Sequence, residues 1–290
     1  MNIPTSCLMT SILGAAIAAN AHSATVNVKV TVENLAPANS ISFAPLHLGF
    51  HNGTYDPFNA GETATPPIIS IAEGGSGSAF FPAFESVQPD AVLGTVVPNP
   101  AGPLLPGATA SAIFTIDSDS NSYFTFGAMA VPSNDYFIGN DGPQAYALFN
   151  ESRVFVPVTI TQSASDLWDA GSELDGTFGA AFLMGSSNDD HIDENGYVTL
   201  DFTDLAVFNG ATTAAGYEFD LQLRPKTLVY RIVIELACSA DLDRDGNVGA
   251  ADLGILLGAW NASGSADLDG NGAVGSEDLA ILLGAWGPCS

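Results

Sequence analysis

This sequence has few positively charged residues. Its 290 residues include 6 Lys and Arg against 32 Asp and Glu, so the formal net charge is −26 at pH 7. Phosphate backbones bind basic surfaces, and this balance therefore argues against a nucleic-acid partner. It also argues against simple electrostatic attraction to an anionic membrane. Calcium binding suits such a composition, and so does a solvated, acidic surface on a secreted protein.

Long apolar runs are missing too, and no segment reaches the roughly 20 residues that a membrane-spanning helix requires. A shorter stretch of small and apolar residues at 7–19 is followed by Ala-Asn-Ala at 19–21. This pattern is typical of a cleaved secretion signal. We therefore expect a signal peptide at residues 1–21, no transmembrane segment, and a protein that is secreted, extracellular or at the cell surface.

The motifs of several common enzyme classes are absent. The sequence contains no Gly-x-Ser-x-Gly, no His-Glu-x-x-His and no glycine-rich phosphate loop. A glycoside hydrolase needs two carboxylates across a sugar-binding cleft, and no motif singles out such a pair among the 32 acidic residues. We therefore expect a protein without catalytic activity.

Cysteine is scarce, with three in the whole chain. Cys7 falls within the expected signal peptide, so export leaves Cys238 and Cys289 at the two ends of a small C-terminal segment. In an oxidising compartment such a pair predicts a disulfide. Closing a loop of about 50 residues stabilises a module by roughly 4 kcal/mol in the chain-entropy account. A metal-binding cysteine pair is disfavoured because no further soft ligand lies nearby.

Apolar residues are plentiful, at 47%, and between residues 24 and 236 they form short runs divided by Gly, Pro, Asn and Asp. In the first run, Val26, Val28, Val30 and Val32 alternate on one face of a strand. Similar runs lie at 111–118, 123–131, 153–161, 197–208 and 228–236. No extended helical period is visible there. The pattern predicts a mainly β fold, an antiparallel β-sandwich.

The C-terminal segment contains a repeat. "DLDRDGNVGAADLGILLGAW" begins at Asp241, and "DLDGNGAVGSEDLAILLGAW" begins at Asp267. A calcium loop needs oxygen ligands at alternate positions, a glycine turn and a carboxylate at the twelfth position. The first copy offers Asp241, Asp243, Asp245, the carbonyl of Asn247, and Asp252. The second copy offers Asp267, Asp269, Asn271, the carbonyl of Ala273, and Asp278. Two such loops in tandem predict two Ca²⁺ sites, each followed by a short helix.

Neither loop has an incoming helix, and the twelfth residue is Asp rather than Glu. Over residues 241–286 this combination resembles the type I dockerin, a calcium-folded module that binds cohesin domains on scaffold proteins of polysaccharide-degrading complexes. The resemblance implies a cohesin-like partner and two equivalent binding orientations. The alternative is a cap resting on the sandwich. We expect Trp260 and Trp286 to pack between the two helices, and the alternative is that they anchor a partner protein. Four leucines, expected mainly in the module's own core, are also candidates for a docking face: Leu256, Leu257, Leu282 and Leu283.

A second resemblance lies in the larger segment. "VPSNDYFIGNDG" from Val131 resembles the Pro-Ser-Pro-Asp-Trp-x-Val-Gly signature of the spondin N-terminal domain family, which includes F-spondin, mindin and secreted bacterial proteins. The upstream "SFAPLHLGFHNGTYDPFNAGETATPPIISIAEGG" and the downstream "LWDAGSELDG" are also similar to this family. The resemblance implies a β-sandwich similar to calcium-dependent lipid-binding domains, with Ca²⁺ at its loop end. The implied ligands are Asp135, Asp169 and Glu173.

Three segments are therefore expected: the signal peptide at 1–21, a spondin-like β-sandwich at 22–237, and a dockerin-like module at 238–290. The expected function is that of a secreted, calcium-binding, non-catalytic adhesion protein with an extracellular glycan or matrix ligand. One alternative is a component of an extracellular glycoside hydrolase complex, attached through the tail. A structural protein of a surface layer or matrix is a third class.

Overall fold

The computed structural model describes residues 25–243 and 247–288. The expected signal peptide at 1–21 lies outside the described residues, as do Asp245 and Cys289. Strand residues make up 31% and helical residues 17%, and the sheets are antiparallel, so the prediction of a mainly β fold is confirmed. Across the described ranges, no helix combines the length and the hydropathy needed to cross a membrane.

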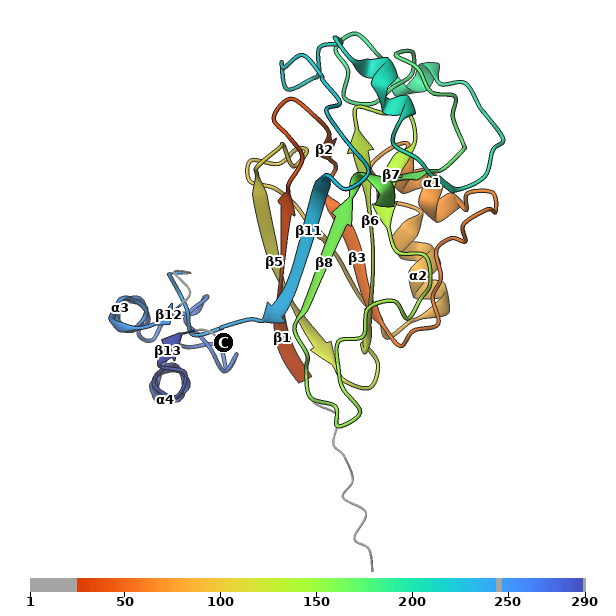
Figure 1. Ribbon diagram of the computed structural model, residues 1–290. Coiled ribbons are helices and arrows are strands. Elements are labelled where there is room, and N and C mark those ends of the chain that lie inside the picture. The colour runs from red at the N-terminus through yellow and green to blue at the C-terminus, as the bar shows by residue number, and fades with distance from the viewer. Residues whose placement is uncertain (1–24, 244–246, 289–290) are drawn as a thin grey trace, which may run out of the picture.

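Two antiparallel sheets form the larger part of the molecule (Figure 1). The first has the order β5 (Thr109–Asp117), β1 (Thr25–Asn34), β11 (Leu228–Leu236), β8 (Val158–Ser163). The second has the order β10 (Thr199–Leu200), β9 (Trp168–Asp169), β7 (Tyr136–Gly139), β6 (Tyr123–Val131), β3 (Leu46–His51), β4 (Val92–Val96), with β2 (Ser42–Phe43) paired to β6.

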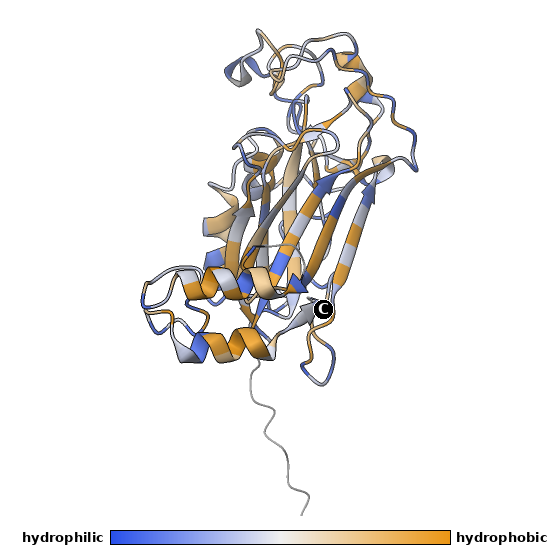
Figure 2. Ribbon diagram, turned by 90° about the vertical axis from the view of Figure 1, so that its left-hand side faces the viewer, coloured by the Kyte–Doolittle hydropathy of each residue, from blue (hydrophilic) through white to orange (hydrophobic). Residues whose placement is uncertain are grey.

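The two sheets share one core. In β1 the alternate residues Val28, Val30 and Val32 are buried, as the period of two predicts, because they face the second sheet. Phe50 of β3 and Phe126 of β6 belong to the same cluster and come from the opposite side. This arrangement, visible in Figures 1 and 2, is compatible with a β-sandwich.

Two helices cover the outer face of the second sheet, and the sequence pattern did not reveal them. They are α1 (Pro66–Ala72) and α2 (Phe80–Val87), both too short to show an extended period of 3.6. Glycines allow them to approach the strands closely. A Cβ atom on Gly49 of β3 would lie 2.5 Å from the ring of Phe84, and one on Gly127 of β6 would lie 2.8 Å from Ile71.

Two of the expected strands are shorter than the apolar runs that suggested them. Of residues 153–161, only the part from Val158 onward is in β8. Of residues 197–208, only β10 is strand, and Asp204–Phe208 is a 3₁₀ helix. The Asp201 carboxylate accepts hydrogen bonds from the N–H groups of Thr203 and Asp204, which closes a turn at this point. Two further 3₁₀ turns span Ala164–Asp166 and Asn188–Asp190.

The C-terminal segment has its own small core. It contains β12 (Asn247–Val248), α3 (Ala250–Gly258), α4 (Ser276–Gly284) and β13 (Gly287–Pro288), with β12 and β13 paired antiparallel. Its buried cluster shares no residue with the sandwich core and comprises Ala240, Val248, Leu256, Ala266, Val274 and Leu282.

Cys238 forms a disulfide. Its pairing with Cys289 stays a prediction. We refer to residues 238–288 as the tail.

The tail and the loops after β9 extend from different ends of the sandwich. The tail follows the end of β11, where the N–H of Ala237 donates to the carbonyl of Asn27 at 2.8 Å. The loops between β9 and β11 gather at the other end, at the top of Figure 1. The two groups of expected calcium ligands are therefore far apart in the molecule.

Candidate metal centres

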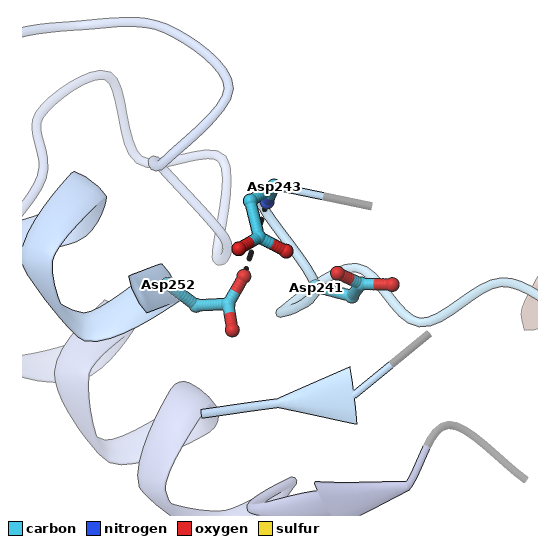
Figure 3. Close-up of side chains that lie close together, drawn as sticks. All are labelled: Asp241, Asp243 and Asp252. Carbon is cyan, nitrogen blue, oxygen red and sulfur yellow. Dashed lines mark hydrogen bonds between the residues drawn. The ribbon is translucent and has the colours of Figure 1, made fainter. Parts of the chain in front are cut away.

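The first tail loop brings three aspartates together. Asp241 and Asp243 lie in the loop before α3, and Asp252 lies in its first turn (Figure 3). Each offers one carboxylate oxygen, and these oxygens all lie within 4.8 Å of one another. Three carboxylates at this separation repel one another strongly unless a cation lies between them. The donor set is oxygen only, which fits a hard divalent cation.

Asp252 is held in place by backbone donors from its own loop. Its Oδ1 accepts from the N–H groups of Leu242 at 2.7 Å and Asp243 at 3.1 Å, and its Oδ2 accepts from Gly249 at 2.7 Å. Burial opposes its ionisation, but these backbone hydrogen bonds outweigh burial and hold its pKa below the ordinary value. Asp252 is therefore a fixed, ionised carboxylate at physiological pH.

The second loop repeats this arrangement with Asp267, Asp269 and Asp278. Asp278 Oδ1 accepts from Leu268 at 2.5 Å and Asp269 at 3.0 Å, and its Oδ2 accepts from Gly275 at 2.6 Å. The Gly275 hydrogen bond contributes most to holding the pKa of Asp278 below its ordinary value. The same contacts therefore recur at the same three positions, one sequence repeat later.

The other expected tail ligands occupy the loops between these aspartates. Gly272 turns the chain with φ of +101°, in the left-handed region that favours glycine. Asn271 Oδ1 accepts from the N–H of Ala273 at 3.0 Å, so the ligand role predicted for Asn271 requires its oxygen to exchange that partner for a cation. Asn247 and Ala273 each lie two residues before the glycine that caps the following helix.

The exposure of Trp260 and Trp286 differs from what the sequence predicts. Trp260 and Trp286 were expected to pack between the helices, but 40% and 50% of their surfaces are exposed. Leu256 and Leu282 are in the tail core, whereas Leu257 and Leu283 are exposed. Three buried positions per repeat already fill so small a core, so the larger rings remain outside. Figure 2 shows hydrophobic residues along both helices. The exposed tail set consists of Ile255, Leu257, Trp260, Ile281, Leu283 and Trp286.

In the sandwich, Asp135 joins two loops. It lies in the turn between β6 and β7 and is fully buried. Its Oδ2 accepts from the N–H of Ser172 at 2.7 Å, the Oγ of Ser172 at 3.1 Å and the N–H of Glu173 at 3.0 Å. Its Oδ1 is buried and accepts no hydrogen bond from any donor in the described ranges. Burial, above all, raises the pKa of Asp135.

Glu173 and Asp169 are placed differently around Asp135. Glu173 is 2% exposed, and neither of its carboxylate oxygens accepts a hydrogen bond from a described donor. Asp169, in β9, uses Oδ1 to accept from the N–H of Gly171 at 2.6 Å. Burial, followed by the charge of Asp135, raises the pKa of Asp169 to about 7. The oxygens of these three residues do not all come within 4.8 Å of one another, unlike those of the tail triads.

Two further acidic residues near this centre were not identified from the sequence. Burial and the charge of Asp135 raise the pKa of Asp175 to about 7, and the hydroxyl of Tyr136 donates to Asp175 Oδ2 at 3.2 Å. Asp175 lies two residues after Glu173 in the segment that resembles the spondin family, so its position could have suggested it. Glu73 lies at the end of α1 and contributes to the field at Glu173.

These geometries are the basis on which the function is inferred. No protein-family model matches the chain, and no curated protein matches it.

Proposed function

We propose that this protein is a secreted, calcium-dependent, non-catalytic binding protein in which a spondin-like β-sandwich carries a dockerin-like docking tail. One observation carries the proposal. The same triad of aspartates is assembled twice, at equivalent positions of two consecutive loop–helix units. A single acidic turn is common on a protein surface, whereas a repeated triad around a buried, backbone-fixed carboxylate is typical of a paired calcium module.

The chemistry of the donors favours calcium over a transition metal. Neither triad contains a histidine or a cysteine, so soft or borderline metals would lack the ligands they prefer. Asp252 and Asp278 remain ionised because backbone donors hold them. In this proposal, the remaining loop residues that the sequence predicts as ligands complete the coordination of each tail ion. They include Asp245, which lies outside the described ranges. The bound ion supplies positive charge that neutralises the aspartates, and folding of the tail follows from that.

A third calcium ion is proposed for the loop end of the sandwich, with Asp135, Asp169 and Glu173 as the ligands that the spondin resemblance implies. The support is the burial of Asp135 and Glu173, whose Oδ1 and two Oε atoms accept no hydrogen bond from a described donor; His191 Nδ1 lies 3.7 Å from Glu173 Oε1. An ion there would order the loops after β9, where an extracellular glycan or matrix ligand would bind.

Replacing Asp135 by Asn is expected to weaken one calcium site by at least about tenfold, on the scale seen when residues supporting a metal are removed. The two tail sites should be unchanged, because they lie at the other end of the sandwich. Isothermal titration calorimetry of the full chain measures this. Asp90→Asn, at an exposed position, is the matched control. Three unchanged sites in the Asp135 variant would refute the proposed site.

The exposed tail set supports docking over the cap. Its residues occur as equivalent pairs, two on each of α3 and α4 and one tryptophan just after each helix, so the tail offers nearly the same apolar surface twice. Aromatic side chains at such positions commonly anchor a partner. A cohesin-like scaffold protein is the proposed partner. The same contact would attach the protein to an extracellular polysaccharide-degrading complex, which is the alternative role.

If the tail binds its partner through either of two similar surfaces, the two tryptophans should be able to substitute for one another in binding. Replacing Trp260 or Trp286 alone by Ala should reduce affinity for a cohesin-type domain by only about twofold, since the other surface still binds. The double variant should lose roughly 30-fold, about 2 kcal/mol, as expected for one hot-spot aromatic per orientation. Surface plasmon resonance over a panel of cohesin-type domains, with calcium and with chelator, measures this. Equal losses in the single and double variants would exclude two orientations.

Two further assays distinguish a binding protein from a hydrolase. The protein should release no reducing sugar from a panel of polysaccharides. It should be retained on glycan or matrix-protein arrays in calcium and released by chelator. Sugar release that survives purification would instead support the hydrolase alternative.

A further inference from the structure

A groove of about 350 Å³ lies between the turn that joins β5 to β6 and the hairpin that precedes β8. The last residue of β5 pairs with the first residue of β1, and Val28 of β1 pairs with the last residue of β11. The groove is therefore at the end of the sandwich from which the tail departs, the lower end in Figure 1. Its volume is within the range of about 300–1,000 Å³ that small-molecule sites occupy. The side chains that line it include Asp119, Tyr123, Phe149, Asn150, Glu151 and Arg153.

Both walls of the groove are fixed by hydrogen bonds of their own. In the first wall, Asp117 Oδ1 accepts from the N–H of Asp119 at 2.8 Å. In the second wall, Asn150 Oδ1 accepts from the N–H groups of Ser152 at 2.9 Å and Val154 at 3.0 Å. A ligand that enters between two such turns does not have to order them, which lowers the cost of binding.

An ion pair joins the two walls at the surface. Arg153 Nη1 lies 2.7 Å from Asp119 Oδ1, and the two side chains are 38% and 48% exposed. Arg153 has a φ of +61°, in the left-handed region that is uncommon for residues other than glycine and that recurs at functional positions. A guanidinium beside a carboxylate offers hydrogen-bond donors and acceptors at one place.

Two half-buried aromatic rings add flat apolar surface to the same groove. The Tyr123 ring packs against Gly53, where an added Cβ atom would lie 2.8 Å from the ring. The Phe149 ring lies edge-on to the ring of Phe155, with their centroids 5.9 Å apart. Both rings are therefore supported from behind, and their remaining surface lines the groove.

The mixture of these side chains selects among ligand classes. Two carboxylates, Asp119 and Glu151, together with a net charge of −26 disfavour phosphates and other anions. The polar lining disfavours a lipid chain, and a cationic ligand would compete with Arg153 for Asp119. A neutral sugar fits best, because its hydroxyl groups both donate and accept while its C–H faces can pack on aromatic rings.

We infer that this groove binds a neutral saccharide and does so without calcium. The inference rests on the glycan ligand of the proposed function and adds a site for it, at the opposite end of the sandwich from the loops after β9. In the site, Tyr123 and Phe149 pack against a sugar ring, while Arg153, Asp119 and Asn150 bind its hydroxyl groups. An open groove of this size gives weak binding, which the washing of an array removes.

Native affinity electrophoresis of the full-length protein detects such weak binding. The gels contain chelator and one neutral polysaccharide each: xylan, galactomannan or mixed-linkage β-glucan. At least one of them should retard the parent. Arg153→Gln and Asp119→Asn should each raise the apparent Kd for that polysaccharide by about tenfold, as expected for a residue that contributes strongly to binding. Arg231→Gln is the matched control, because it removes another exposed ion pair, with Glu33, away from the groove. It should behave as the parent.

The outcomes separate this inference from the proposed function. A parent that no polysaccharide retards in chelator would overturn the inference, and so would equal retardation of the parent and the two groove variants. Retardation that requires calcium would place the glycan at the loop end, which supports the proposed function and refutes the groove. Retardation in chelator that depends on Arg153 and Asp119 supports the groove, whatever number of calcium ions the protein binds.

Discussion

Chelation of the full-length protein is expected to abolish most of the helicity of α3 and α4. Each helix has nine residues, too few to be stable alone in water. Among the described residues the tail core contains six buried hydrophobic side chains, and four of them are the small residues alanine or valine. Without a cation, the two aspartate triads repel within loops that must close before the helices can pack. In such modules, metal binding supplies the folding free energy.

Circular dichroism and amide NMR spectra of the full chain, in calcium and in chelator, measure the effect. The sandwich is the internal control, because its strand signal should persist. The double variant Asp252→Asn, Asp278→Asn should behave in calcium as the parent does in chelator, while each single variant should lose one ion. The disulfide at Cys238 limits expansion, so helicity and not size is the readout. Helices that persist in chelator would refute calcium-dependent folding of the tail.

The second large effect concerns pH. In chelator, the melting temperature of the sandwich should fall as pH rises from 5 to 8. Burial and neighbouring carboxylates raise the pKa of Asp169, Glu173 and Asp175 to about 7 each. In the unfolded chain these groups titrate near 4. Between the two values the folded state holds more protons than the unfolded state, so stability is greatest at low pH and is lost as pH rises through 7.

A decrease of at least about 3 °C is expected, which corresponds to roughly 1 kcal/mol in a domain of this size. Saturating calcium should flatten the dependence, because the cation stabilises the ionised carboxylates. Asp252 and Asp278 do not contribute in this window, because their pKa values are lowered and they titrate below it. Differential scanning calorimetry at several pH values measures the trend. A melting temperature in chelator that rises from pH 5 to pH 8 would contradict the buried, uncompensated carboxylates.

Local periodicity explains which parts of the fold could be anticipated. The alternation of Val28, Val30 and Val32 predicts a half-buried strand, and β1 pairs with β5 and β11 through that segment. The spacing of Asp241, Asp243 and Asp252 also matches the calcium-loop pattern, and the structure brings one oxygen of each within 4.8 Å of the others; that they bind a cation stays a prediction. Both signals lie within a dozen consecutive residues, where spacing converts directly into geometry.

Features that depend on distant segments could not be predicted in this way. Helix α1 is only seven residues long and begins with two prolines, so its helical pattern is too brief to distinguish from a turn. The charge of Glu73 acts on Glu173 across a separation of 100 residues in the chain, and no local spacing connects them. The tryptophans were misplaced for a related reason. Their hydrophobicity suggested a core position, but the volume of the tail core is already filled by smaller residues.

The number of calcium ions bound by the purified full-length protein tests the central claim most directly. Native mass spectrometry in micromolar calcium, repeated after chelation, counts them without a spectroscopic label. The account predicts three ions per chain, two in the tail and one in the sandwich, and none after chelation. A protein that binds no calcium under these conditions, while its tail helices remain folded, would contradict it.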